Sequence, residues 1–299
     1  MKADPSQASR RRLGLLYGII ASALWGTVWV CVRYLMDVRG LEPVYMAAMR
    51  FGIGACAAVV YMLVTGRGRD LVRASAELGN LALLGSIGIF GMGVCVFFSG
   101  EYTASINSSL IVNSNAVFIA VFAALLGERV PWLRFVGLFL GLAGCATILF
   151  SGAHAEGPGS NDLLGGALGL GAAICWAAYT ALGKRVVRRV GGLAASTVTL
   201  VIGALMLAAL AMLRGGIRPL DGPELAVITF LGIVPTAGAM MLWYRALDLI
   251  DASALGPTQY VAPILGTLLG AGLLHEPVGI GFVLGAALVL VGLQLSSRE

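Results

Sequence analysis

The chain alternates long apolar runs with short polar breaks, and this alternation leaves few folds open to it. A helix of about 20 apolar residues is long enough to cross ~30 Å of hydrocarbon. We expect ten such spans, at 13–35, 43–65, 79–99, 104–126, 132–151, 163–184, 193–213, 224–245, 253–274 and 278–296. The longest polar breaks are 66–78, 152–162 and 214–223. The other connections are short, so consecutive helices should be antiparallel neighbours.

The composition points to lipid, rather than water, as the surroundings of these helices. Hydrophobic residues make up 59% of the chain and charged residues only 12%, about half the charged share of a soluble domain. The 42 glycines suit membrane helices, where small residues allow close helix packing. The predicted fold class is therefore an all-α polytopic membrane protein.

The positions of Lys and Arg predict how the chain lies in the membrane. If the N-terminus is cytoplasmic, the inner segments hold 15 of these residues and the outer segments hold four, with Arg50 inside the second span. Positive charge favours the cytoplasmic side. We therefore expect a multi-pass protein of a bacterial inner membrane with both termini in the cytoplasm. Topology also explains the net charge of +5, so no nucleic-acid partner is expected.

The two halves of the chain resemble each other. Aligning them pairs Trp25 with Trp176, Glu128 with Glu276, Gly137 with Gly285, and Gly144 with Gly292. The predicted organisation is a cytoplasmic tail 1–12, a first repeat 13–151, a linker 152–162, and a second repeat with a short tail 163–299. Because five spans is an odd number, the second repeat should enter the membrane from the opposite side. Ten helices in two inverted repeats are typical of secondary transporters with a midplane site.

Several short motifs occur in the same order in this chain as in a known transporter family. They are Ala23-Leu24-Trp25-Gly26, Arg50, Leu126-Gly127-Glu128, Pro257, Pro263, Leu274-His275-Glu276-Pro277, Gly281, Gly285 and Gly292. The chain resembles the EamA family of the drug/metabolite transporter superfamily, and within it the exporters of aromatic amino acids of the YddG type. The resemblance implies ten spans, cytoplasmic termini, and export or exchange of metabolites. The first half departs from the pattern, with Asn115 where Pro263 aligns.

Aromatic residues in the middle of two spans are the first candidates for the substrate site. Trp25 and Trp176 occupy equivalent positions, too deep for interfacial anchors. Trp29 lies one turn beyond Trp25, and Tyr179 follows Trp176 in the same span. Rings at these positions would favour a large apolar or aromatic substrate. Packing between helices is the alternative interpretation.

Arg50 is a cation inside an apolar run, where it needs a partner or water. It could contact a substrate carboxylate. Alternatively, it snorkels to the outer end of its span, or pairs with carbonyl groups and an acid such as Glu42.

Polar and kinked segments supply the remaining candidates. Lining of a cavity and hydrogen bonding between helices are the two interpretations for Asn113 and Asn115. For Gln259 and Tyr260, between Pro257 and Pro263, the interpretations are a part in the substrate site and a purely structural kink. Helix kinks are expected at Pro235, Pro257 and Pro263. These kinks either help to form the substrate site or gate, or are purely structural. Glu128 and Glu276 should order loops by capping or pairing, or act in gating.

The function predicted from these features is a secondary transporter that exports amino acids, aromatic and other neutral ones, or similar small metabolites by alternating access. The alternatives are a membrane enzyme or flippase acting on lipid-linked substrates, and a channel. No catalytic pattern, nucleotide motif or metal-ligand spacing is recognisable, so no enzyme activity, cofactor, metal or obligate protein partner is expected. The expected partners are a small-molecule substrate and the lipid bilayer.

Overall fold

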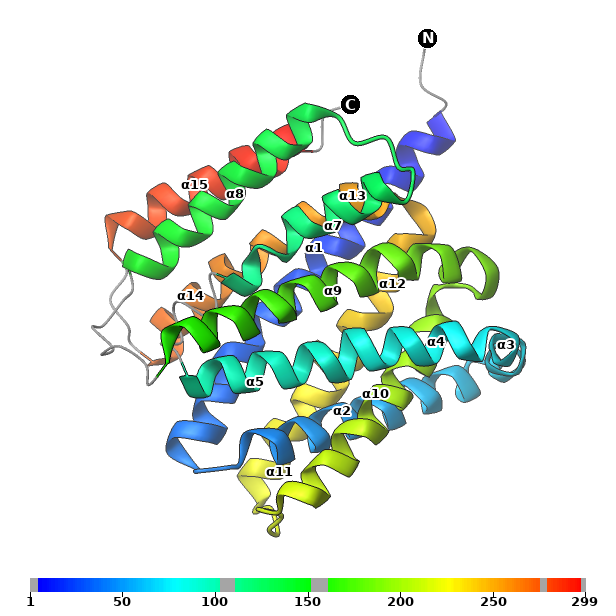
Figure 1. The fold of residues 1–299 in the computed structure, drawn as a ribbon, viewed down its shortest axis with the longest axis vertical. Coiled ribbons are helices and arrows are strands. Elements are labelled where there is room, and N and C mark those ends of the chain that lie inside the picture. Colours follow the sequence, from blue (N-terminus) through cyan, green and yellow to red (C-terminus); the bar gives the residue numbers. More distant parts are fainter. Residues whose placement is uncertain (1–4, 103–110, 152–160, 275–278, 297–299) are drawn as a thin grey trace.

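A computed structural model describes residues 5–102, 111–151, 161–274 and 279–296 (Figure 1). These residues form helices and no strand. The α-helices are α1 (Pro5–Arg33), α2 (Pro43–Val64), α3 (Gly68–Ala74), α4 (Leu78–Gly85), α5 (Met92–Tyr102), α7 (Asn115–Leu125), α8 (Trp132–Ser151), α9 (Asp162–Val190), α10 (Gly192–Arg214), α11 (Gly222–Leu231), α12 (Ala239–Leu249), α13 (Ala252–Leu255), α14 (Val261–Leu274) and α15 (Ile280–Ser296). The π-helical segments are η1 (Tyr34–Val38), η3 (Ser86–Gly91) and η4 (Gly232–Gly238). The 3₁₀ segments are η2 (Ser75–Glu77) and η5 (Gly256–Tyr260).

Seven helical runs in the described residues are long and apolar enough to cross a membrane. They are Ser9–Met36, Pro43–Val64, Gly68–Ser99, Trp132–Phe150, Leu163–Val190, Gly192–Arg214 and Gly222–Leu249. Two shorter apolar helices, Ile111–Leu125 and Ile280–Ser296, add to them. The chain is therefore a multi-pass membrane protein.

Several predicted boundaries were wrong, and each has a local reason. The polar break expected at 66–78 is largely helical, because α3 and η2 lead directly into α4. Asp70 in the first turn of α3 and Arg73 in its last turn suit the helix dipole, while Ala74 is buried. The sixth span was expected to end at residue 184, but α9 continues to Val190 with Arg188 and Arg189 in its last turn. In addition, residues 5–12 of the predicted tail are helical and form the start of α1.

Glycines bring α8 and α15 into close contact as an antiparallel pair (Figure 1). A Cβ at Gly137 would lie 2.4 Å from the carbonyl oxygen of Gly292, and one at Gly144 would lie 2.6 Å from that of Gly285. As one residue number rises the other falls, so the helices run in opposite directions. The repeat alignment pairs Gly137 with Gly285 and Gly144 with Gly292, so the Gly137–Gly292 contact corresponds to the Gly144–Gly285 contact.

The π-helical segments η3 and η4 each pack against a glycine-bearing helix of the other half. Gly54 of α2 faces η4, where an added Cβ would lie 2.9 Å from the carbonyl oxygen of Gly232. Gly203 of α10 faces η3, where an added Cβ would lie 2.3 Å from Ile89. A π-helical segment inside an α-helix often marks a functional site, and here two such segments lie in corresponding spans.

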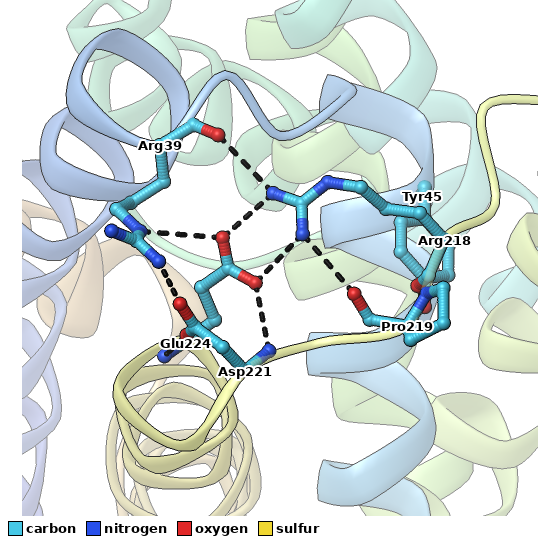
Figure 2. A network of polar contacts seen from close by, with 6 residues as sticks. All are labelled: Arg39, Tyr45, Arg218, Pro219, Asp221 and Glu224. Atoms are coloured by element: carbon cyan, nitrogen blue, oxygen red, sulfur yellow. Dashed lines mark hydrogen bonds and ion pairs between the residues drawn. The ribbon is translucent and has the colours of Figure 1, made fainter.

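Ion pairs join the loops at one end of the helix bundle, called the Glu224 end below (Figure 2). Glu224 accepts hydrogen bonds from Nη2 of Arg218, at 2.6 Å, and from Nε of Arg39, at 3.3 Å. Arg39 also pairs with Asp221, and Tyr45 donates to the carbonyl oxygen of Arg218 at 2.9 Å. The carboxylate of Glu224 raises the pKa of Arg218. The α1–α2 connection is thereby fixed to the α10–α11 connection.

A second set of polar contacts holds the junction of α12 and α13 at the opposite end, called the Glu128 end. Lys184 donates to the carbonyl oxygens of Leu247, at 2.6 Å, and Ile250. Glu128 accepts from the main-chain N–H groups of residues 252 and 253, both at 3.1 Å. The Glu128 carboxylate thus accepts from two N–H groups of the first turn of α13, as a helix cap does.

The start of α1 and the end of α15 both lie at the Glu128 end. Gly14 of α1 packs against Ile250, and the carbonyl oxygen of Ser296 accepts from Arg134 Nε at 3.2 Å. The two ends of the described chain thus lie on the same side of the bundle (Figure 1).

Candidate functional site

Five aromatic rings from three helices meet in the interior. Trp25 of α1 lies 5.2 Å from Trp176 of α9 and 5.2 Å from Trp243 of α12, measured between ring centroids. Trp176 lies 5.4 Å from Tyr179, and Tyr179 lies 5.0 Å from Tyr244. All but Trp25 are buried. We refer to these five residues as the aromatic cluster.

The contact between Trp25 and Trp176 brings together two residues that the repeat alignment pairs. A residue that touches its own repeat partner lies where the two halves meet. Their rings cross edge to face at an interplanar angle of 86°, a favourable geometry for aromatic pairs. The sequence-predicted residues Trp25, Trp176 and Tyr179 are therefore close together in the structure.

Trp243 is a member of the cluster that sequence reasoning missed. The eighth span was predicted to end at residue 245, which put Trp243 at the membrane edge. The helix instead continues to Leu249, so Trp243 lies farther from the end of its helix than predicted. Its Nε1 donates to Thr180 Oγ1 at 3.2 Å. Two adjacent aromatic residues in one span, Trp243 and Tyr244, were the sequence signal that could have identified it.

Two polar groups in the cluster differ in how they are satisfied. The hydroxyl of Tyr179 shares a hydrogen bond with Thr199 Oγ1 at 2.9 Å. The Nε1 of Trp176 is buried and donates to no acceptor among the described residues. A buried donor without an acceptor costs free energy.

Arg50 reaches the π-helical segment η4. Its Nε donates to Thr236 Oγ1 at 2.7 Å, and Thr236 is buried. Among the residues that the structure describes, Arg50 forms no ion pair. Glu42, one of the partners considered for it, instead accepts from the N–H of Tyr45 at 2.5 Å and pairs with Arg214 at 3.5 Å.

Asn115 and Gln259 are buried on elements that pack together. Asn115 begins α7 and Gln259 lies in η5. A Cβ at Gly256 of η5 would lie 3.2 Å from the carbonyl oxygen of Ala116. The Oδ1 of Asn115 and the Nε2 of Gln259 have no hydrogen-bond partner among the described residues. This region thus holds an unused acceptor and an unused donor, whereas Asn113 does have a polar interaction.

Other predicted site residues lie apart from the aromatic cluster or outside the description. Tyr260 belongs to a separate apolar cluster, packs on Gly141 and donates to the carbonyl oxygen of Leu138 at 3.0 Å. The side chain of Trp29 and all of Glu276 lie outside the described part of the chain.

The prolines expected to kink helices lie in three different settings. Pro235 is inside the π-helical segment η4, and Pro257 is inside the 3₁₀ segment η5. Pro263 falls in the first turn of α14, where proline is tolerated. Irregular backbone is therefore present at two of these positions.

Two apolar grooves lie on the surface of the bundle, with volumes of about 500 and 610 Å³. The first is lined by residues of α2 together with Ile233, and the second by residues of α7, α8 and α9. Neither groove includes a ring of the aromatic cluster. The rings in the interior pack against one another instead of lining either groove.

Several known proteins are similar to this chain over almost its full length. An uncharacterized transporter of Archaeoglobus fulgidus is 28% identical, covering 92% of this chain and 95% of its own. The aromatic amino acid exporter YddG of Ancylobacter novellus is also 28% identical, and the match covers 87% of this chain and 88% of the exporter. A solved crystal structure, 23% identical, has the same fold with a TM-score of 0.83 and covers 95% of this chain and 97% of that one.

The model of one protein family matches the chain twice. The description of this family is EamA-like transporter family, and the matches cover residues 12–150 and 163–298. Both halves of the molecule thus fit the same repeat, as the pairing of Trp25 with Trp176 and of the α8 and α15 glycines requires. This chain belongs to the EamA-like transporter family.

Proposed function

We propose that the protein is a secondary transporter that exports amino acids, aromatic and other neutral ones, or similar small metabolites. The contact between Trp25 and Trp176 at the junction of the two repeats carries this proposal, because transporters of repeat architecture bind substrate there. A centre rich in aromatic rings suits a large apolar side chain. The exporter YddG of Ancylobacter novellus, whose name specifies aromatic amino acids, supports the same substrate class.

The proposed mechanism is alternating access by two inverted repeats of five spans. The antiparallel packing of α8 on α15, with glycine contacts that interchange under the repeat alignment, supports the inversion. The excess of Lys and Arg near the Glu128 end supports a cytoplasmic location for this end and for both termini. Substrate would reach the centre from one end while contacts close the other.

Counter-flow in proteoliposomes tests the proposal. A carrier should take up labelled phenylalanine or leucine in a saturable way, and internal unlabelled amino acid should speed uptake. Trp25→Ala and Trp176→Ala should each reduce uptake at least about tenfold. Trp132, which is 74% exposed on α8, offers a matched control, and Trp132→Ala should transport normally.

Other outcomes would favour other functions. Flux that does not saturate and shows no counter-flow would indicate a channel. Movement or modification of a lipid-linked substrate without amino-acid uptake would favour the flippase or membrane enzyme. Normal transport by both tryptophan variants would show that the aromatic cluster is not the site.

A further inference from the structure

Arg50 places a positive charge inside a membrane helix next to an irregular segment of another helix. Burying a cation in a membrane is costly unless it is paired or serves a function. The guanidinium has five N–H donors, and its hydrogen bond to the described residues uses only Nε, which donates to Thr236. We propose that Arg50 and Thr236 form a subsite for the carboxylate of the transported molecule. This inference rests on the proposed transport function and specifies the substrate as a small carboxylate.

Glycine packing fixes the position of this pair. The carbonyl oxygen of Arg50 would lie 2.9 Å from a Cβ at Gly232, and a Cβ at Gly54 would lie 3.0 Å from Thr236 Cγ2. At these distances no side chain fits between α2 and η4, so the two backbones are held together. Arg50 is therefore held at η4 rather than directed to the end of its span.

The corresponding contact in the other half has no charge. A Cβ at Gly85 would lie 2.7 Å from the carbonyl oxygen of Thr199, just as one at Gly232 lies close to the carbonyl oxygen of Arg50. Thr199 thus occupies the position of Arg50, and its hydroxyl bonds to Tyr179. Since α10 packs on η3 without a cation, the packing of α2 on η4 does not require one either. The arginine is an asymmetric addition to a symmetric frame, as a group that recognises one end of a substrate would be.

The aromatic cluster lies at a suitable distance along the same helical run. Trp243 follows Thr236 by seven residues in one continuous helical run, with Thr236 in the π-helical segment η4 and Trp243 in α12, so the two lie about two turns apart. Thr236 bonds to Arg50, while Trp243 contacts Trp25. A molecule with its carboxylate at Arg50 would extend an apolar side chain toward the rings. Such a molecule would bind in one orientation only.

The charge at the subsite favours a carboxylate over a phosphate. A carboxylate carries one negative charge and accepts two parallel hydrogen bonds from a guanidinium. A phosphate monoester carries up to two charges and would leave one unpaired beside a lone arginine. Because Arg39 and Arg218 already pair with carboxylates at the Glu224 end, they do not supply the second charge.

Binding measurements on pairs of acids and amides test the subsite. The quenching of tryptophan fluorescence in the purified protein would report binding of phenylalanine against phenylalaninamide, and of 3-phenylpropanoate against its amide. The natural protein should bind each acid roughly 10- to 100-fold more tightly than its amide, the range for hydrogen bonds to charged groups. Arg50→Gln should abolish this preference, chiefly by weakening acid binding, while Arg50→Lys should keep part of it.

Two further variants separate recognition from folding. Thr236→Val removes the hydroxyl that positions Nε and should reduce the preference by a smaller factor than Arg50→Gln. Arg245→Gln, at an arginine that is 45% exposed near the Glu128 end, is the control and should leave the preference unchanged. Melting temperatures identify any variant that fails to fold. If Arg50→Gln fails to fold, the acid-over-amide preferences of Arg50→Lys and Thr236→Val decide whether the subsite exists.

The subsite and the transport function can fail separately. Equal binding of acid and amide by the natural protein, or an unchanged preference in Arg50→Gln, would overturn the subsite. Saturable counter-flow without that preference would leave the carrier standing. Arg50-dependent binding of acids without counter-flow would retain the subsite and reject the carrier.

Discussion

Arg39 and Glu224 form an ion pair at one end of the bundle, with Nε and Oε1 3.3 Å apart. A pair of the same kind, Arg189 with Glu77, closes the other end at 2.8 Å. Arg189 follows Arg39 by 150 residues and Glu224 follows Glu77 by 147, close to the offsets of the repeat alignment. The two pairs are therefore corresponding contacts of the two halves.

The two pairs differ in how well they are shielded from solvent. The side chain of Glu224 is 1% exposed and also binds Arg218, whereas the side chains of Arg189 and Glu77 are 63% and 17% exposed. Exposed ion pairs contribute little to stability, and breaking a buried one is costly. Glu224→Gln should therefore lower the melting temperature by several degrees, while Glu77→Gln should lower it by no more than a degree or two. Equal shifts in a thermal unfolding assay would contradict this ranking.

Close packing of α8 and α15 depends on glycine at the contact. Gly292→Ala would place a Cβ 2.4 Å from the carbonyl oxygen of Gly137, so the helices must separate. Overpacking of this kind costs about 1–3 kcal/mol, and we expect lower stability and reduced transport. Gly272→Ala on α14 is the control, since a Cβ there meets nothing within 4 Å. A stable Gly292→Ala protein would show that the contact is looser than described.

The sequence predicted the class of fold and the centre of the candidate site, but not how polar groups are paired. Trp25 and Trp176 could be found because repetition marks equivalent positions. Thr236 could not be identified as the partner of Arg50, because a single threonine in an apolar run carries no signal and the contact joins residues 186 apart in sequence. Tyr260 was a candidate as one of the polar residues between Pro257 and Pro263, and its hydroxyl donates to the carbonyl oxygen of Leu138 on α8.

Glu128 should determine how firmly the junction of α12 and α13 is held. Glu128→Ala removes the acceptor for the N–H groups of residues 252 and 253, a loss of the size of a helix cap, about 0.5–2 kcal/mol. Hydrogen exchange measured by mass spectrometry should then become faster over residues 250–255. Asp70→Ala is the control, because that carboxylate is 41% exposed and its ion pair among the described residues is with an exposed arginine. Unchanged exchange in Glu128→Ala would show that Lys184 holds the junction alone.

The inverted arrangement that we propose predicts that corresponding loops are accessible from opposite sides of the membrane. Val38, after α1, and Arg188, at the end of α9, occupy corresponding places and are each 69% exposed. In a background without the natural cysteines, Val38→Cys should react with a membrane-impermeant maleimide applied outside cells. Arg188→Cys should react only after the membrane is opened, because the positive-inside rule places its loop in the cytoplasm. Labelling of both from the same side would mean that the second half is not inverted, and alternating access by inverted repeats would then have to be abandoned.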